Sequence, residues 1–235
     1  MDEIRHALDT VFAADSDVYR TRGFMRRVGF GKRPALLHID LANAWTRPGN
    51  AFSCDGTDEI IAGVQRLNAA ARAKRLPIVY TTTAYAVTDG EFTDMGLWHH
   101  KIPVEVLALG SDAVAIDERI SPEPGDQVVV KKFASAFFGT NVANMLRASG
   151  VDTLIITGVT MAGCVRHTTE DAIGLGFRPI VVRECVGDRV PGVVEWNLFD
   201  IDAKFGDVES LDTVLEYLAN VEAHEAHALS PSQRA

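Results

Sequence analysis

Three side chains able to take part in nucleophilic catalysis follow predicted apolar strands. Asp40 ends the segment PALLHID, Lys131 ends QVVVK, and Cys164 lies six residues beyond TLIITG, at the start of a predicted helix. The positive end of a helix dipole lowers the pKa of a thiol, and a nearby lysine would lower it further. An aspartate within hydrogen-bond reach could accept the thiol proton. These residue types are therefore the parts of a nucleophilic hydrolase, provided that the fold brings the three strand ends together.

Each of these residues also has a simpler interpretation when it is taken alone. An aspartate after a strand is more often a turn residue, a lone lysine is usually solvated, and a lone cysteine is most often packed inertly. Three such residues at the ends of strands favour the catalytic interpretation. The two other cysteines, Cys54 and Cys185, are predicted to be structural. An odd count of three is typical of free thiols in a reducing cytosol, so we expect a cytoplasmic protein.

The chain alternates predicted strands and helices. Strands are expected at 34–40, 77–83, 127–131, 153–158 and 178–185, and helices from Thr57 to about Ala71 and at 141–149, 164–175, 191–205 and 209–221. The strands are apolar throughout, which is typical of parallel pairing with both faces covered. The pattern predicts an α/β fold with a doubly wound, mostly parallel six-stranded sheet and helices on both faces. In such sheets ligands bind at the carboxyl ends of the strands.

The length of 235 residues fits one domain with flanking segments. We divide the chain into an N-terminal arm (1–30), one α/β domain (31–222) and a flexible tail (223–235). The arm is expected to carry a short amphipathic helix over Glu3–Ala13 and to serve in packing or in swapping between subunits. Residues 84–102 form a longer polar and aromatic excursion than a simple connection needs.

Charge and hydropathy exclude several classes of partner. The net charge is −9, which argues against a sequence-independent nucleic-acid binder. It does not exclude a small anionic substrate, because one local arginine can outweigh the overall field. No apolar run is long enough to span a membrane, and the mixed-charge N-terminus is not a secretory signal. We therefore expect neither nucleic acid nor membrane as a partner.

Four segments resemble the isochorismatase-like superfamily of cysteine hydrolases. They are HIDLANAW (38–45), KKFASAFFGTN (131–141), GVTMAGCVRHTTEDAIGLGFRP (158–179) and GDRVPGVVEWNLFDIDAKFGDVES (187–210). Within this superfamily the segments are most similar to the N-carbamoylsarcosine amidohydrolases, over about residues 16–218. The resemblance implies hydrolysis of the terminal carbamoyl C–N bond of N-carbamoylsarcosine to sarcosine, carbon dioxide and ammonia, through a covalent cysteine intermediate.

The resemblance also implies roles for particular residues. Asp40 would be the base and Cys164 the nucleophile. Lys131 rather than Lys132 would complete the triad, because only Lys131 stands at the family's spacing from Ser-Ala-Phe. A cis peptide bond between Val159 and Thr160 would place the Thr160 N–H beside that of Cys164, and the two amides would receive an oxyanion.

Further residues are implied to bind the substrate. Arg189 in the GDR segment resembles the residue that binds the substrate carboxylate, and the arginine fork suits that planar group. A surface salt bridge is the alternative role for this arginine. Trp98, together with Asn43 and Trp45, would line the pocket, with ordinary core packing as the alternative. The expected substrate is a small ureido or amide compound that bears a carboxylate.

The resemblance implies neither a metal nor a cofactor. Nicotinamidases of this superfamily hold a metal with Asp and His residues soon after the first catalytic aspartate, but no histidine occurs here between His38 and His99. True isochorismatases lack the cysteine nucleophile. Two alternatives remain: an amidase acting on maleamate, ureidoacrylate or biuret, and a non-catalytic binding module on the same fold. By resemblance we expect a homo-oligomer, namely a tetramer.

Overall fold

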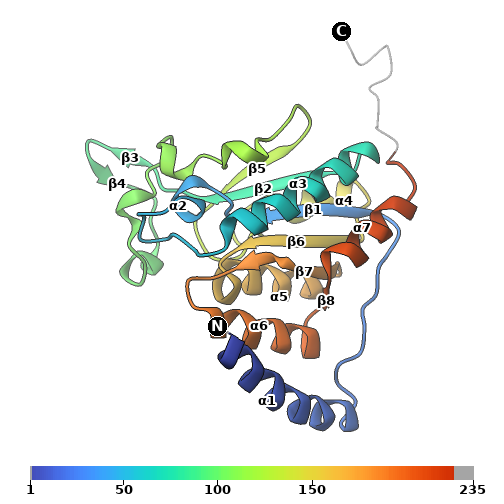
Figure 1. Ribbon diagram of the computed structural model, residues 1–235. Coiled ribbons are helices and arrows are strands. Elements are labelled where there is room, and N and C mark those ends of the chain that lie inside the picture. The colour runs from blue at the N-terminus through green and yellow to red at the C-terminus, as the bar shows by residue number, and fades with distance from the viewer. Residues whose placement is uncertain (1, 225–235) are drawn as a thin grey trace, which may run out of the picture.

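The computed structural model describes residues 2–224, and within them six strands form one sheet in the order β5-β2-β1-β6-β7-β8. These strands are β1 (Pro34–Ile39), β2 (Ile78–Thr83), β5 (Gln127–Lys131), β6 (Thr153–Val159), β7 (Arg178–Gly187) and β8 (Asp207–Glu209). Each neighbouring pair is parallel. The predicted doubly wound sheet is thus confirmed (Figure 1).

Helices cover both faces of this sheet (Figure 1). The helices are α3 (Thr57–Ala73) and α7 (Leu211–Asn220) on one face, and α4 (Val142–Ala148), α5 (Arg166–Gly174) and α6 (Pro191–Lys204) on the other. Successive residues of β1 point to opposite faces, so Leu36 packs in the core under α3 and α7 while Leu37 packs in the core under α4 to α6. Burial on both faces explains why the strands are apolar throughout.

The connections around the sheet carry short elements. They are α2 (Asn43–Thr46), a hairpin of β3 (Val87–Thr88) and β4 (Glu91–Phe92), and 3₁₀ turns at Leu97–His100, Val104–Val106, Asp112–Val114 and Glu118–Ile120. The hairpin lies within the excursion predicted at 84–102. The last strand, β8, lies between the two helical stretches predicted at 191–205 and 209–221.

The N-terminal helix is longer than expected. Instead of ending near Ala13, α1 (Asp2–Thr21) continues to Thr21, and Gly23, with a φ of 84°, then turns the chain away from the helix axis. It packs on α6 of the same chain, where the rings of Phe12 and Phe199 stack with centroids 4.5 Å apart. No helix in the described part of the chain is long and apolar enough to cross a membrane. Most of the tail predicted at 223–235 lies outside the described residues.

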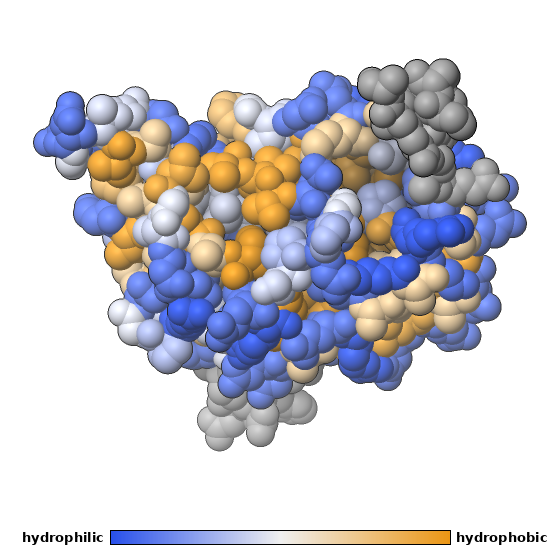
Figure 2. Space-filling model, turned by 90° about the horizontal axis from the view of Figure 1, so that it is seen from above, coloured by the Kyte–Doolittle hydropathy of each residue, from blue (hydrophilic) through white to orange (hydrophobic). Residues whose placement is uncertain are grey.

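One edge of the sheet is formed by β5, and its outward face is open. Val128 and Val130 are 49% and 37% exposed, although both lie within a strand. Figure 2 shows the molecule from the β5 side, where hydrophobic groups reach the surface between hydrophilic ones. An edge strand with exposed valines is a surface suited to contact with another protein.

The strand order reverses between β1 and β6. From β1 the chain builds outward to β2 and β5 on one side, and from β6 outward to β7 and β8 on the other. The carboxyl ends of strands at such a reversal leave a crevice in which ligands bind in open α/β sheets. Asp40 directly follows β1, and the GVTMAGC segment follows β6. This end of the sheet is therefore where a ligand is expected to bind.

Candidate active site

The side chains of Asp40, Lys131 and Cys164 meet at the carboxyl edge of the sheet. Lys131 Nζ lies 2.7 Å from Asp40 Oδ2 and 3.4 Å from Cys164 Sγ. Asp40 and Lys131 are 0% exposed, and Cys164 is 6% exposed. The structure thus brings together the three residues that the sequence singled out, in a nearly closed site.

The sheet topology explains why a lysine is needed in the middle. Lys131 is the last residue of β5, in register with Thr83 of β2. β2 separates β5 from β1, so the two outer strands lie about 10 Å apart. The long lysine side chain passes over β2 to reach Asp40, and its ammonium donates to Thr83 Oγ1 at 2.7 Å on the way. The neighbouring Lys132 instead donates to the carbonyl of Ala84.

Two threonines of β2 hold the aspartate, and the sequence analysis did not identify them. Thr81 Oγ1 donates to Asp40 Oδ1 at 3.1 Å, and Thr83 Oγ1 donates to Asp40 Oδ2 at 3.2 Å. The backbone of Asp40 has a φ of +49°, which turns it out of the strand direction. A pair of threonines two apart at the end of PIVYTTT was the available signal, because residues i and i+2 share one face of a strand.

The cluster keeps Lys131 charged. Burial alone would lower the pKa of Lys131, but the Asp40 carboxylate, together with the hydrogen bond to Cys164, outweighs burial and raises it above its usual value. The ammonium also donates to the carbonyl of Phe133 at 3.1 Å. Its donors are therefore directed at Asp40, Thr83, Phe133 and Cys164.

The predicted lowering of the Cys164 pKa is wrong. Burial raises the pKa of this thiol to about 12, although Lys131 acts in the opposite direction. In addition, Cys164 does not begin an α-helix: it lies in a π-helical turn, Met161–Val165, which precedes α5. Removal from water outweighs the effect of the lysine, so the resting residue is a thiol. Asp40 is the adjacent group able to accept its proton.

The turn before Cys164 has the backbone form that the resemblance implied. The Val159–Thr160 peptide bond is cis. The carbonyl of Thr160 accepts from the N–H groups of Gly163 at 3.0 Å and of Val165 at 3.2 Å. These hydrogen bonds fold the turn so that Thr160 and Cys164 belong to one compact unit.

Arg189 follows β7 and is held by the segment after α2. Its Nη1 donates to the carbonyl oxygen of Phe52 at 3.0 Å. Trp45 supports this segment, because its ring lies 5.0 Å from that of Phe52 and its carbonyl accepts from Cys54 N at 3.0 Å. Trp45 is only 3% exposed and packs under the segment that holds Arg189.

Comparison with known proteins identifies the family. An isochorismatase domain matches residues 34–213, which is most of the chain. The chain belongs to the isochorismatase family. N-carbamoylsarcosine amidase from Arthrobacter sp. is 58% identical over 213 residues, which cover 90% of this chain and 81% of that protein. Maleamate amidohydrolase from Pseudomonas putida is 40% identical over 197 residues, covering 83% and 92%.

A solved structure agrees with this assignment. A cysteine hydrolase from Pseudomonas syringae pv. phaseolicola superposes with a TM-score of 0.75 at 25% identity, covering 83% of this chain and 96% of that one. The superfamily predicted from the sequence is confirmed, and the chain is an isochorismatase-like cysteine hydrolase.

The other residues predicted to line the pocket of this isochorismatase-family chain lie in different surroundings. The ring of Trp98 contacts that of Phe133, with centroids 5.1 Å apart, beside the backbone that follows Lys131. Asn43 is 3% exposed, and its Nδ2 donates to the carbonyl of Asp112 at 2.8 Å. Asn43 therefore ties α2 to the loop before β5.

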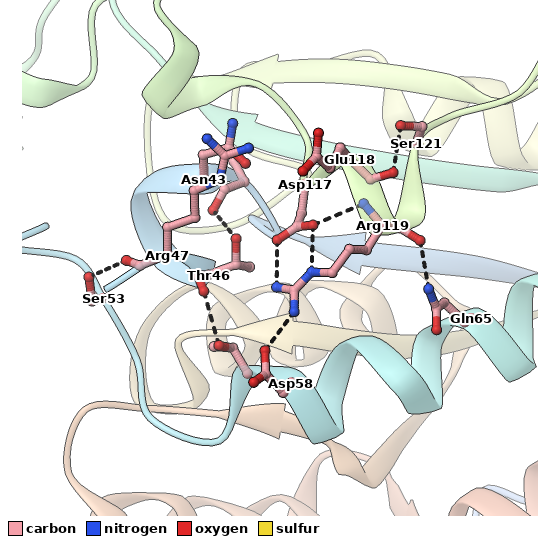
Figure 3. Close-up of polar contacts among 12 residues, drawn as sticks. Asn43, Thr46, Arg47, Ser53, Asp58, Gln65, Asp117, Glu118, Arg119 and Ser121 are labelled. Carbon is pink, nitrogen blue, oxygen red and sulfur yellow. Dashed lines mark hydrogen bonds and ion pairs between the residues drawn. The ribbon is translucent and has the colours of Figure 1, made fainter. Parts of the chain in front are cut away.

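An ion pair between the buried Asp117 and the partly exposed Arg119 fixes the loop that lies beside the end of β1. The side chains of Asp117 and Arg119 point at each other, with Asp58 of α3 on the far side of the guanidinium (Figure 3). The backbone N–H of Asp117 donates to the carbonyl of Leu41 at 3.0 Å. Hydrogen bonds from Arg119 outweigh burial and lower the pKa of Asp117 to about 2. The loop thus stays anchored to both α3 and the end of β1.

A cavity of about 720 Å³ lies at the carboxyl end of β7, and its lining includes neither the three clustered residues nor Arg189. It lies between the first turns of α3 and α6. Asp55 lines it on the α3 side, and Asp188 and Pro191 line it on the α6 side. Asp188 is the point at which this cavity meets the turn that carries Cys164. Over residues 2–224, no three His, Cys, Asp or Glu side chains are grouped to hold a metal ion.

Proposed function

We propose that this enzyme hydrolyses the terminal carbamoyl C–N bond of N-carbamoylsarcosine, giving sarcosine, carbon dioxide and ammonia. The observation that carries the proposal is the buried Asp40–Lys131–Cys164 cluster in a chain 58% identical to an N-carbamoylsarcosine amidase. All three residues take part in one continuous set of hydrogen bonds, which a non-catalytic binding module has no need to keep. The similarity to a maleamate amidohydrolase also supports a small amide as the substrate.

The first half of the reaction begins from a neutral thiol. Asp40 takes the Sγ proton while Cys164 attacks the terminal carbamoyl carbon. Lys131 stays protonated and holds Asp40 and Cys164 in register. The oxyanion of the tetrahedral intermediate accepts from the backbone N–H groups of Thr160 and Cys164. The C–N bond then breaks, and Asp40 returns the proton to the departing ammonia.

The second half consumes one water molecule. The carbonyl carbon is now bonded to Cys164 Sγ and to the sarcosine nitrogen. Asp40 takes a proton from water, whose oxygen attacks that carbon, and the Sγ–C bond breaks as the thiol regains a proton. The product is the carbamic acid of sarcosine, which loses carbon dioxide. One substrate and one water thus give one each of sarcosine, carbon dioxide and ammonia.

Arg189 supplies the proposed contact with the substrate carboxylate. Its guanidinium is held by the carbonyl of Phe52 and by a hydrogen bond with Cys54, and because arginine has five N–H donors, others remain for a ligand. Anchoring the carboxylate would place the carbamoyl group at Cys164 and lower the entropic cost of attack. Trp98 would form part of the wall beside Phe133.

The test is ammonia release by the purified protein, without added metal, from a panel of amides. The panel contains N-carbamoylsarcosine, N-carbamoylglycine, maleamate, ureidoacrylate, biuret and nicotinamide. We expect the highest kcat/KM for N-carbamoylsarcosine. A higher kcat/KM for maleamate, ureidoacrylate or biuret would reject N-carbamoylsarcosine as the substrate but leave the proposed mechanism in place. If no compound of the panel releases ammonia, the non-catalytic binding module is favoured instead.

We also propose that the enzyme is a cytoplasmic homo-oligomer, namely a tetramer. The exposed valines of the edge strand β5 support an interface between copies. Light scattering after gel filtration tests this part, and a monomeric mass at micromolar concentration would reject it.

A further inference from the structure

Asp188 bridges two segments that the proposed function requires to act together. It is the first residue after β7 and is half-buried. One carboxylate oxygen, Oδ2, accepts from the backbone N–H of Ala162 at 3.0 Å. The other, Oδ1, accepts from the backbone N–H of Arg189 at 2.8 Å. Because Arg189 is the next residue in the chain, the bond to Ala162 is the one that joins two segments, and a hydrogen bond to a carboxylate is about twice as strong as a neutral one.

The two ends of this bridge carry different chemistry. Ala162 lies in the π-helical turn, two residues before Cys164. Arg189 is the proposed carboxylate anchor, and its own side chain reaches the carbonyl of Phe52. No other side chain in the described part of the chain is hydrogen-bonded to both the nucleophile turn and the backbone of Arg189. The bridge therefore links the turn that carries Cys164 to the backbone of the residue that carries the guanidinium.

We propose that Asp188 is a positioning residue that sets the separation between the Cys164 thiol and the Arg189 guanidinium. It would thereby select amide substrates by the distance between their scissile carbonyl carbon and their carboxylate. The inference rests on the proposed function of Arg189. Asp188 itself does not meet the reacting atoms, because both its oxygens are occupied by backbone N–H groups.

The first test compares an acidic substrate with its neutral counterpart. Asp188→Asn keeps the size of the side chain but offers an N–H₂ group to one of the two backbone donors, so one arm of the bridge is lost. We expect kcat/KM to fall about tenfold for N-carbamoylsarcosine, as for one lost hydrogen bond to a charged group. For its methyl ester, which cannot use Arg189 as a carboxylate anchor, the fall should be less than threefold.

A matched control is available in the same cavity. Asp55→Asn removes the same charge from the cavity wall, at a residue that is exposed and lies on the α3 side. We expect this variant to behave like wild type on both substrates. An equal loss on acid and ester in Asp188→Asn would overturn the inference, because it would indicate damage to the nucleophile turn alone.

A double-mutant cycle separates positioning from a general structural role. Arg189→Ala should lower kcat/KM for the acid, and adding Asp188→Asn should then leave the ratio of acid to ester unchanged. Fully additive losses would contradict the proposal. If the wild type prefers another acidic amide, the same comparison is made with that amide and its methyl ester. A failure of the substrate assignment is then distinguishable from a failure of the bridge.

One readout needs no turnover. Iodoacetate and iodoacetamide alkylate the same thiol but only the first carries a carboxylate. We expect the ratio of their Cys164 alkylation rates to be lower in Asp188→Asn than in wild type, and to approach the ratio in Arg189→Ala. A wild-type ratio in Asp188→Asn, with the thermal unfolding temperature unchanged, would overturn the inference.

Discussion

At the residue scale, the protonation states of Lys131 and Cys164 follow from their burial and from their neighbours. Burial raises the pKa of Cys164 to about 12, while the neighbouring carboxylate and thiol keep Lys131 protonated. At rest Cys164 is a thiol and Lys131 is an ammonium, so Asp40 is the neighbour that can accept the thiol proton. An activated thiolate at rest is unnecessary in this arrangement, because Asp40 can remove the proton as the Sγ–C bond forms.

Thr83 connects the two charged members of the cluster, and its removal should lower the rate. In Thr83→Val the hydroxyl that accepts from Lys131 Nζ at 2.7 Å and donates to Asp40 Oδ2 at 3.2 Å is lost. Both charged groups then lack one partner and lose their alignment. We expect kcat for ammonia release to fall about tenfold with little change in KM.

The neighbouring Thr82 provides the control for this substitution. It is equally buried, but its hydroxyl points to the opposite face of β2 and donates to the carbonyl of Val114 at 2.8 Å. Thr82→Val should leave kcat within twofold of wild type. A similar loss of kcat in both variants would mean that the effect comes from β2 as a whole and not from the cluster.

The sequence alone predicts that Asp40, Lys131 and Cys164 lie close together, but it does not predict their hydrogen bonds. Parallel strands end at the same edge of a sheet, so residues at their carboxyl ends become neighbours whatever the exact register. The bonds of Thr83 and Asp188 depend on register and on loop paths, which uniformly apolar strands do not specify. The thiol pKa was mispredicted for a related reason: the depth of burial is a property of the whole fold.

At the scale of elements, the end of β6 is shaped by a close approach to β1. Gly158 has a φ of 110°, and a Cβ atom built on it would lie 2.0 Å from the carbonyl oxygen of Ile39. Gly158→Ala therefore forces both a disfavoured backbone conformation and a backbone clash. We expect the free energy of unfolding to fall by about 3 kcal/mol or more, measured by urea or thermal unfolding.

A second glycine tests whether this cost is local. Gly174 lies at the end of α5, and a Cβ atom there would meet no atom within 4 Å. Gly174→Ala should leave the protein as stable as wild type or slightly more so, since alanine favours the helix. If Gly158→Ala unfolds at the wild-type urea concentration, the described contact between β6 and β1 is wrong.

Two elements that the sequence did not predict are the strand β8 and the second half of α1. The strand β8 has 3 residues between two helices, which is too short for a periodic pattern to be distinguished from a turn. The second half of α1 carries the apolar side chains of Phe12 and Tyr19, which contact Phe199 of α6, and nothing interrupts the helix before it ends at Thr21. The long amphipathic α3, in contrast, begins at Thr57 as predicted.

At the scale of the whole molecule, stability depends on a histidine inside the sheet. His38 of β1 is 0% exposed. Its Nε2 lies 2.8 Å from Asn68 Oδ1, an acceptor only, so Nε2 carries the proton and Nδ1 accepts from the hydroxyl of Thr157 at 2.7 Å. The ring is neutral in the folded protein, and burial lowers its pKa from 6.5 to about 4.

This histidine predicts acid sensitivity in a defined pH window. The unfolded chain takes up the proton near pH 6.5 and the folded chain only near pH 4, so the stabilisation is complete above pH 6.5 and is lost as the pH falls towards 4. The loss amounts to about 3 kcal/mol. Urea unfolding at several pH values should show this slope. His38→Gln cannot titrate and should flatten it, whereas an unchanged slope in that variant would assign the acid sensitivity to other groups.

The account as a whole depends on Cys164 forming the covalent bond to the carbamoyl carbon. The most direct measurement is ammonia release from N-carbamoylsarcosine by wild type and by Cys164→Ala, with thermal unfolding to show that both are folded. The account predicts turnover by the wild type and a loss of kcat of about 10⁴-fold or more in the variant, as for other covalent nucleophiles. A folded Cys164→Ala protein that retains a tenth of the wild-type kcat would contradict it.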